Sequence, residues 1–159
     1  MTQPQSVITD AMRATIGKES EVITYEVDRS SCRAFARAVG YTDPVYYDAE
    51  AARAQGYRDI PAPFGFLGHP ALMPGQRNPA FFSEFPYEPP LKRILNGGNQ
   101  LQYFADVCAG DVLQASAHIA ELTERQGGMG LMVMSVKEVV YRDQQGKTVA
   151  KLRGTIILY

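Results

Sequence analysis

Four segments rich in β-branched and aromatic residues fill the C-terminal part of the chain, and they constrain the fold more than any other feature. They are "NQLQYFADV", "DVLQASAHIAELTE", "GLMVMSVKEVVYRD" and "TVAKLRGTIILY". The turn signals "CAGD", "RQGGM" and "DQQGK" separate them. Because short connections join antiparallel neighbours, the second half is predicted to form a long antiparallel meander.

The first half opens with one strand and one helix. Residues 21–28, "EVITYEVD", alternate β-branched or aromatic residues with charged ones, which is typical of a half-buried strand. Ser30 or Ser31 is then expected to cap a helix that ends at Gly40.

A turn and a second, short helix follow. The ring of Pro44 disfavours helical geometry at Asp43, so this pair is predicted to form a turn. Asp48 is expected to cap a short helix that closes at Gly56. The loop of residues 40–48 therefore lies between two capped helices.

The apolar residues 64–73, "FGFLGHPALM", are the strongest candidate for a buried helix, although Gly68 and Pro70 weaken it. A curled antiparallel sheet must bury its apolar face, and this helix is the natural element for it to wrap. The fold class is therefore α+β. Residues 74–90, rich in Pro, Phe and Tyr, are predicted to be an ordered excursion over the surface.

Composition and charge limit the function. The 159 residues suit one domain, with 45% hydrophobic and 21% charged residues and a formal charge of -1. No run of Lys or Arg could neutralise a row of phosphates, so nucleic acid is not an expected partner. A local basic patch around Lys92 and Arg93 could still meet a small anionic ligand.

Neither a metal nor a cofactor is expected. Cys32 and Cys108 do not have the spacing of metal ligands and are expected to be reduced structural thiols. The histidines, His69 and His118, are far apart in the sequence, and there is no glycine-rich phosphate loop. Residues 1–20 form a leader without the apolar core of a signal peptide or anchor, which favours a cytoplasmic protein and no membrane partner.

The segments "DPVYYDAEAARAQGYRDIPAPFGF" and "LNGGNQLQYFADVCAGD", with the order of elements, resemble the MaoC-like dehydratase family of hotdog folds. The chain is most similar to the N-terminal-type domain that serves as the substrate-binding subunit of heterodimeric hydroxyacyl-thioester dehydratases. The resemblance runs from Tyr25 to Leu158. It implies a single hotdog domain over residues 21–159, with a long curved antiparallel sheet wrapped around a central helix.

The resemblance also locates an altered catalytic loop. Active members of the family, the R-specific enoyl-CoA hydratases, carry Gly-Asp-x-Asn-Pro-x-His-x-Asp, in which Asp and His share the proton chemistry. The equivalent segment is "GYTDPVYYD", where Tyr41 replaces the Asp, Tyr46 replaces the His and Asp43 stands at the Asn position. Tyrosine, with a pKa near 10, is a poor base at neutral pH. The loop alone therefore lacks the usual acid-base pair.

Substrate binding is expected to survive. In the family, a backbone N–H at the start of the central helix faces the thioester oxygen, and Gly65 occupies that position; the alternative is a tight turn into a buried helix. Around Asn96, paired glycines form either a simple bulge or a close approach for the pantetheine arm. The residues expected to contact the acyl thioester are Gly65, Tyr41, Tyr46, Pro63, Phe64, Phe66, Gly97 and Gly98.

Two residues are candidates for a relocated catalytic base. Asp43 could act as acid or base, or could simply accept local backbone hydrogen bonds in its turn. His69, on a continuing helix, would share a face with Gly65, or else be structural or part of an interface. His118 is expected on a polar, solvated strand face.

Three functions remain open. The first is a component of an R-specific enoyl-thioester hydratase or 3-hydroxyacyl-thioester dehydratase, a hydro-lyase of fatty acid metabolism that relies on a partner subunit for the Asp and His. The second is a non-catalytic homodimeric acyl-CoA-binding protein, and the third is a homodimeric hydro-lyase with relocated acid and base. All three imply an acyl-CoA or acyl carrier protein thioester as ligand. All three also imply a homodimer, or a heterodimer with a catalytic MaoC-like subunit, because a lone hotdog leaves an open sheet edge.

Overall fold

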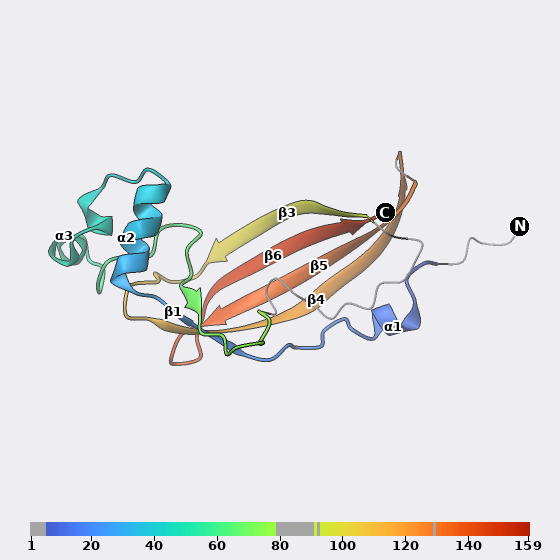
Figure 1. The fold of residues 1–159 in the computed structure, drawn as a ribbon, viewed down its shortest axis with the longest axis horizontal. Helices are drawn as coiled ribbons and strands as arrows, with labels where there is room; N and C mark the ends of the chain where they lie inside the picture. The colour runs from blue at the N-terminus through green and yellow to red at the C-terminus, as the bar shows by residue number, and fades with distance from the viewer. Residues whose placement is uncertain (1–5, 79–90, 92, 129) are drawn as a thin grey trace, which may run out of the picture.

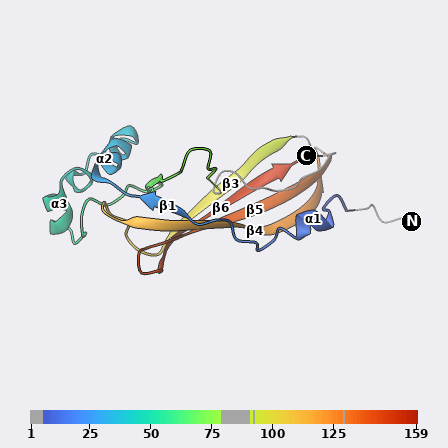
Figure 2. The same ribbon diagram turned by 60° about the horizontal axis from the view of Figure 1, so that its bottom comes forward.

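The computed structural model describes residues 6–78, 91, 93–128 and 130–159. Its main feature is one long curved sheet, with α2 and α3 beyond one end and α1 near the other (Figures 1 and 2). The elements are α1 (Asp10–Arg13), β1 (Ile23–Glu26), α2 (Arg29–Ala38), a 3-10 turn (Pro44–Tyr46), α3 (Ala49–Ala54), β2 (His69–Pro70), β3 (Ile94–Tyr103), β4 (Val112–Gly127), β5 (Gly130–Arg142) and β6 (Thr148–Leu158). No helix in these described ranges is long and apolar enough to cross a membrane.

The sheet has six strands in the order β2-β1-β4-β5-β6-β3, all antiparallel. The predicted meander is confirmed for β4, β5 and β6. The expectation that β3 neighbours β4 is wrong, because β3 crosses over to pair with β6 at the sheet edge. The connection from β3 to β4 runs along residues 60–62 instead of forming a hairpin: Ala62 N–H donates to Val107 O and Ala109 N–H donates to Ile60 O, each at 2.8 Å.

The helix predicted over residues 64–73 is wrong. Gly65 and Gly68 have φ angles of 92° and 90°, in a left-handed region that ends helical geometry. Pro70 then pairs with Tyr25 in the short strand β2. The longest described helix is α2, which lies at one end of the sheet and buries Cys32.

Helix caps follow the sequence chemistry closely. Asp48 caps α3 by accepting a hydrogen bond from Glu50 N at 2.8 Å, and Gly56 follows the helix with φ of 91°, as predicted. The cap of α2 is Asp28, two or three residues before the predicted Ser30 or Ser31. Asp28 is the better cap here because its carboxylate accepts from both the N–H and the hydroxyl of Ser31.

Two apolar clusters form the core. The larger joins the inner side of α2 to the sheet and residues 60–67; its members include Cys32, Ile60, Phe66, Leu67, Leu113, Val139 and Tyr141. The smaller contains Ile8, Met12, Leu91, Val133 and Leu158. The described part of the predicted leader, residues 6–20, therefore packs against the sheet. Its α1 contributes Met12, which is fully buried.

Candidate functional site

The loop of residues 40–48 leaves α2 and keeps the turn predicted from its sequence. Gly40 has φ of 78° after the end of the helix. Asp43 caps the 3-10 turn, and its carboxylate accepts a hydrogen bond from Val45 N at 2.9 Å. The turn role predicted for Asp43 is thus observed; a catalytic role for this exposed carboxylate stays a prediction.

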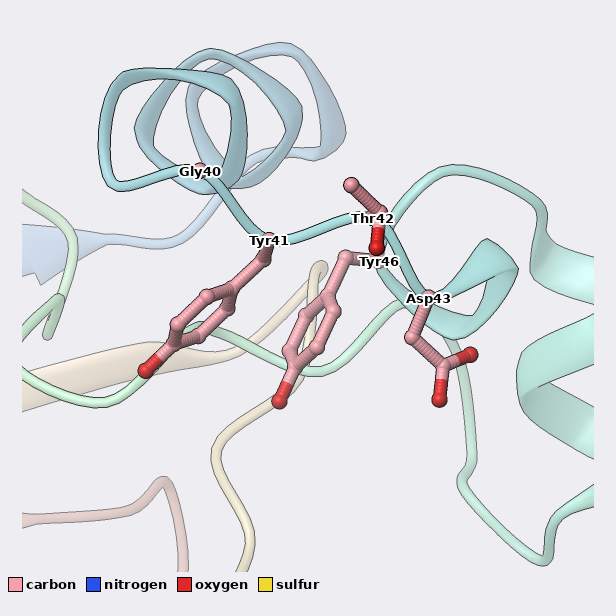
Figure 3. A pocket seen from close by; sticks show the side chains of 5 residues that line it. All are labelled: Gly40, Tyr41, Thr42, Asp43 and Tyr46. Atoms are coloured by element: carbon pink, nitrogen blue, oxygen red, sulfur yellow. The ribbon is translucent and has the colours of Figure 1, made fainter.

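Tyr41 and Tyr46 stand where the resemblance puts the family's Asp and His, and their side chains lie together. Their ring centroids are 5.0 Å apart, and Figure 3 shows both hydroxyls pointing the same way beside the Asp43 carboxylate. An open depression of about 300 Å³ is lined by Gly40, Tyr41, Thr42, Asp43 and Tyr46. The Tyr47 hydroxyl fixes the loop by donating to the Tyr41 carbonyl oxygen.

The Tyr46 phenol is a poor base at neutral pH. Burial, together with the neighbouring Tyr41, Tyr57 and Asp43, raises the pKa of Tyr46 above its ordinary value. A protonated phenol can donate or accept a hydrogen bond, but it cannot take a proton as the missing histidine would. The Tyr46 phenol in this depression can therefore hydrogen-bond a polar group but does not replace the histidine as a base.

Gly65 lies in a second loop, facing β3. Its N–H donates to the Tyr103 hydroxyl at 3.2 Å, and residues 66–73 form no helix, so the helix dipole expected behind this N–H is absent. Pro63 is fully buried, whereas Phe64 is 64% exposed and lies 5.4 Å from the Tyr103 ring, measured between centroids. The oxyanion role of Gly65 stays a prediction, and in this structure its N–H already has a partner.

Phe66 and His69 point to different environments. Phe66 is 7% exposed and packs on Phe35, so it belongs to the core, and its predicted contact with the acyl thioester stays a prediction. His69 is exposed in β2, opposite Glu26, with its ring edge-on to Phe66 at 5.3 Å. The shared helical face predicted for Gly65 and His69 does not exist.

Gly97 and Gly98 form a β-bulge in β3. The register against β6 shifts between Asn96 and Gly98, and the Asn96 side chain accepts from Gly98 N at 2.9 Å. A Cβ on Gly97 would come within 3.0 Å of Thr155 Cγ2, which explains the glycine. The bulge is observed, and a contact of Gly97 and Gly98 with the pantetheine arm stays a prediction.

Sequence reasoning missed two features of the site. Tyr103 was not singled out, although it alternates with Leu101 on the side of β3 that packs against the core. Asp111, in the "AGD" of the family resemblance, accepts two hydrogen bonds from Arg58, at 2.8 and 2.9 Å, and one from Cys108 N at 2.9 Å. This motif therefore anchors the connection that leads into β4.

Within the described ranges no group of three or more His, Cys, Asp or Glu side chains could hold a metal ion. The cysteines Cys32 and Cys108 are free and buried. His118 lies with Nδ1 3.1 Å from the Glu19 carboxylate and is 20% exposed at its side chain, so it is less solvated than predicted.

Comparisons with known proteins agree with this fold. The ChsH1–ChsH2 complex of Mycobacterium tuberculosis contains a chain that superposes with a TM-score of 0.77 at 19% identity, covering 96% of this chain and 95% of the other. The HadBC complex of the same organism, named as a 3R-hydroxyacyl-ACP dehydratase, gives 0.63 at 23% identity, covering 86% and 94%. The curved sheet is thus the hotdog fold of MaoC-like dehydratases, as predicted.

Sequence comparison gives the family. Residues 14–152 match the family described as "FAS1-like, dehydratase domain region". A UPF0336 protein of Clavibacter michiganensis is 31% identical over 134 residues, which cover 84% of this chain and 85% of that protein. The chain belongs to the FAS1-like dehydratase region family.

Proposed function

We propose that this protein is the substrate-binding component of an R-specific enoyl-thioester hydratase or 3-hydroxyacyl-thioester dehydratase, and that a partner subunit supplies the catalytic Asp and His. One observation carries the proposal: the loop of residues 40–48 keeps its capped turn and brings together Tyr41 and Tyr46, the residues that the family resemblance aligns with the catalytic Asp and His. A subunit that keeps the family fold and the loop but lacks the usual base would need a partner for catalysis.

The sheet edge offers the surface for a partner. β3 pairs only with β6, so the outer N–H and C=O groups of this edge strand are free of sheet partners among the described residues. Ile94 and Leu95 are 56% and 41% exposed on it, and Phe104, just beyond, is 48% exposed. A long edge with exposed apolar side chains is a ready template for pairing with another chain. The complexes ChsH1–ChsH2 and HadBC support a second subunit of the same fold.

A non-catalytic homodimer that binds acyl-CoA is the second candidate, favoured by the same Tyr41 and Tyr46 substitutions. The homodimeric enzyme with relocated chemistry has less support. The Asp43 carboxylate already accepts a hydrogen bond from Val45 N, and the His69 ring on β2 packs against the buried Phe66.

Crotonyl-CoA hydration, followed as loss of the enoyl-thioester absorbance, separates the three. The chain is assayed alone, then with a MaoC-like partner that carries the Asp and His loop, and then with that partner after its loop His is replaced by Ala. Activity only with the intact partner supports the proposal. Activity of the chain alone that falls in Asp43→Asn or His69→Ala would establish relocated chemistry instead. No activity in any mixture, with acyl-CoA binding retained, would leave the binding protein.

A further inference from the structure

Tyr103, the last residue of β3, lies beside the Gly65 N–H, which the family resemblance implies would face the thioester oxygen. Its hydroxyl accepts the Gly65 N–H at 3.2 Å, and its ring lies 5.4 Å from that of Phe64. The strand register opposite Ala150 fixes the backbone of Tyr103, so the phenol is held from a rigid element. The loop that carries Gly65 is exposed at Phe64 and Gly65 and can be reached by a ligand.

The hydroxyl of Tyr103 has a hydrogen bond left to give. A phenol has one O–H donor besides its acceptor capacity, and here the Gly65 N–H uses an acceptor site. Across the described residues, this O–H donates to no acceptor. Burial raises the pKa of Tyr103 above its ordinary value and outweighs the opposing effect of the Gly65 N–H, with a smaller upward contribution from Tyr41, so the proton is in place at neutral pH. Accepting from an N–H also polarises the O–H and makes it a stronger donor.

A direct contact between Gly65 and a ligand would require the phenol to leave. The Gly65 N–H has only one hydrogen to give, and Tyr103 already receives it. If the phenol stays, the Gly65 N–H donates to the Tyr103 hydroxyl, and this hydroxyl in turn donates to the ligand oxygen. The exposed Phe64 ring beside it supplies an apolar contact for the carbons next to that oxygen.

We propose that Tyr103 positions the carbonyl oxygen of the acyl thioester: its hydroxyl donates a hydrogen bond to that oxygen while it accepts one from the Gly65 N–H. The proposal rests on the proposed function, since it needs a thioester ligand. Tyr103 is a positioning residue that moves no proton to the substrate. Polar recognition of the ligand then comes from Tyr103 on β3, and not from the Tyr41 and Tyr46 pair.

The test compares two ligands that differ only at the carbonyl. Butyryl-CoA has the thioester C=O, and S-butyl-CoA has a methylene in its place. Isothermal titration calorimetry measures both against the wild type, Tyr103→Phe and the matched control Tyr159→Phe, which lies at the opposite end of the sheet. The wild type and the control should prefer the thioester by about fivefold, the worth of one neutral hydrogen bond. Tyr103→Phe should lose that preference and bind S-butyl-CoA as the wild type does.

A spectroscopic readout guards against a merely structural effect. With butyryl-CoA labelled by isotope at the carbonyl carbon, the C=O stretching frequency should rise in Tyr103→Phe relative to the wild type. If the preference and the frequency are both unchanged in Tyr103→Phe, the proposal is overturned while the proposed function stands. If the wild type binds neither ligand, the proposed function fails, and this proposal fails with it.

Discussion

Replacing Gly68 with Ala tests how closely the loop of residues 63–68 is set against β1. Gly68 has φ of 90°, and a Cβ built there would come within 2.6 Å of the Glu26 carbonyl oxygen and 2.9 Å of the Glu26 carbonyl carbon. Both contacts are with backbone, and real Cβ atoms essentially never approach so closely. The chain can accommodate the methyl only by moving Glu26, which pairs with both β2 and β4.

The cost has two parts. An L-residue in left-handed geometry costs about 1–2 kcal/mol, and overpacking of a well-packed site adds about 1–3 kcal/mol. Gly68→Ala should therefore lower the free energy of unfolding by about 2–5 kcal/mol. The matched control is Gly56→Ala, where φ is 91° but nothing lies within 4 Å of the added Cβ. That variant should lose only the backbone cost, about 1–2 kcal/mol.

Urea unfolding followed by circular dichroism measures both variants, with the slope checked for two-state behaviour. The difference between the two variants isolates the clash with Glu26. Equal losses in Gly68→Ala and Gly56→Ala would refute the close approach of the loop to β1.

Three further predictions concern the charges and thiols. Asp111→Ala should lower the free energy of unfolding by about 2–3 kcal/mol in urea titrations, because it removes charged hydrogen bonds to Arg58 and Cys108 N; a change below about 0.5 kcal/mol would contradict the anchoring role. The Arg29 hydrogen bond lowers the pKa of Asp59 to about 2, so the stability it contributes is complete above about pH 4 and is lost as the pH falls through about 2. The stability gap between wild type and Asp59→Asn should narrow over that window, and a gap independent of pH there would count against the ion pair. Burial raises the pKa of Cys32 to about 12 and that of Cys108 above its ordinary value. Both buried cysteines should therefore react with a thiol reagent only after unfolding, and rapid labelling of the native protein would be inconsistent with their burial.

The sheet was predictable where neighbours in sequence are neighbours in space. β4, β5 and β6 are joined by the "RQGGM" and "DQQGK" turns and pair in order. The position of β3 was not predictable in the same way, because its partner β6 follows only after two intervening strands. The contacts that redirect it, such as Ala62 N–H to Val107 O, join residues far apart in the chain.

The apolar composition of residues 64–73 suggested a helix, but backbone geometry decided otherwise. Gly65 and Gly68 each adopt a positive φ, and Pro70 completes a strand pair with Tyr25. Hydrophobicity identifies such a segment as buried without distinguishing a helix from packed turns. Its core side chain, Phe66, is indeed buried.

In the candidate site, too, local features were predictable from the sequence and long-range contacts were not. The turn at Asp43 and the cap at Asp48 are local, and the sequence predicted both. The contact between Gly65 and Tyr103 spans 38 residues and depends on the crossover of β3, so no local pattern announces it. Long-range contacts of this kind position Tyr103, which we propose binds the thioester carbonyl.

The central claim is that this chain contributes to hydration only through a partner. The most direct measurement adds increasing amounts of the chain to a fixed amount of a MaoC-like subunit carrying the Asp and His loop, and follows the rate of crotonyl-CoA hydration. The account predicts a rate that rises to a plateau, while the chain alone stays at the uncatalysed rate. Hydration by the chain alone, or a rate that never departs from the partner's own, would contradict it.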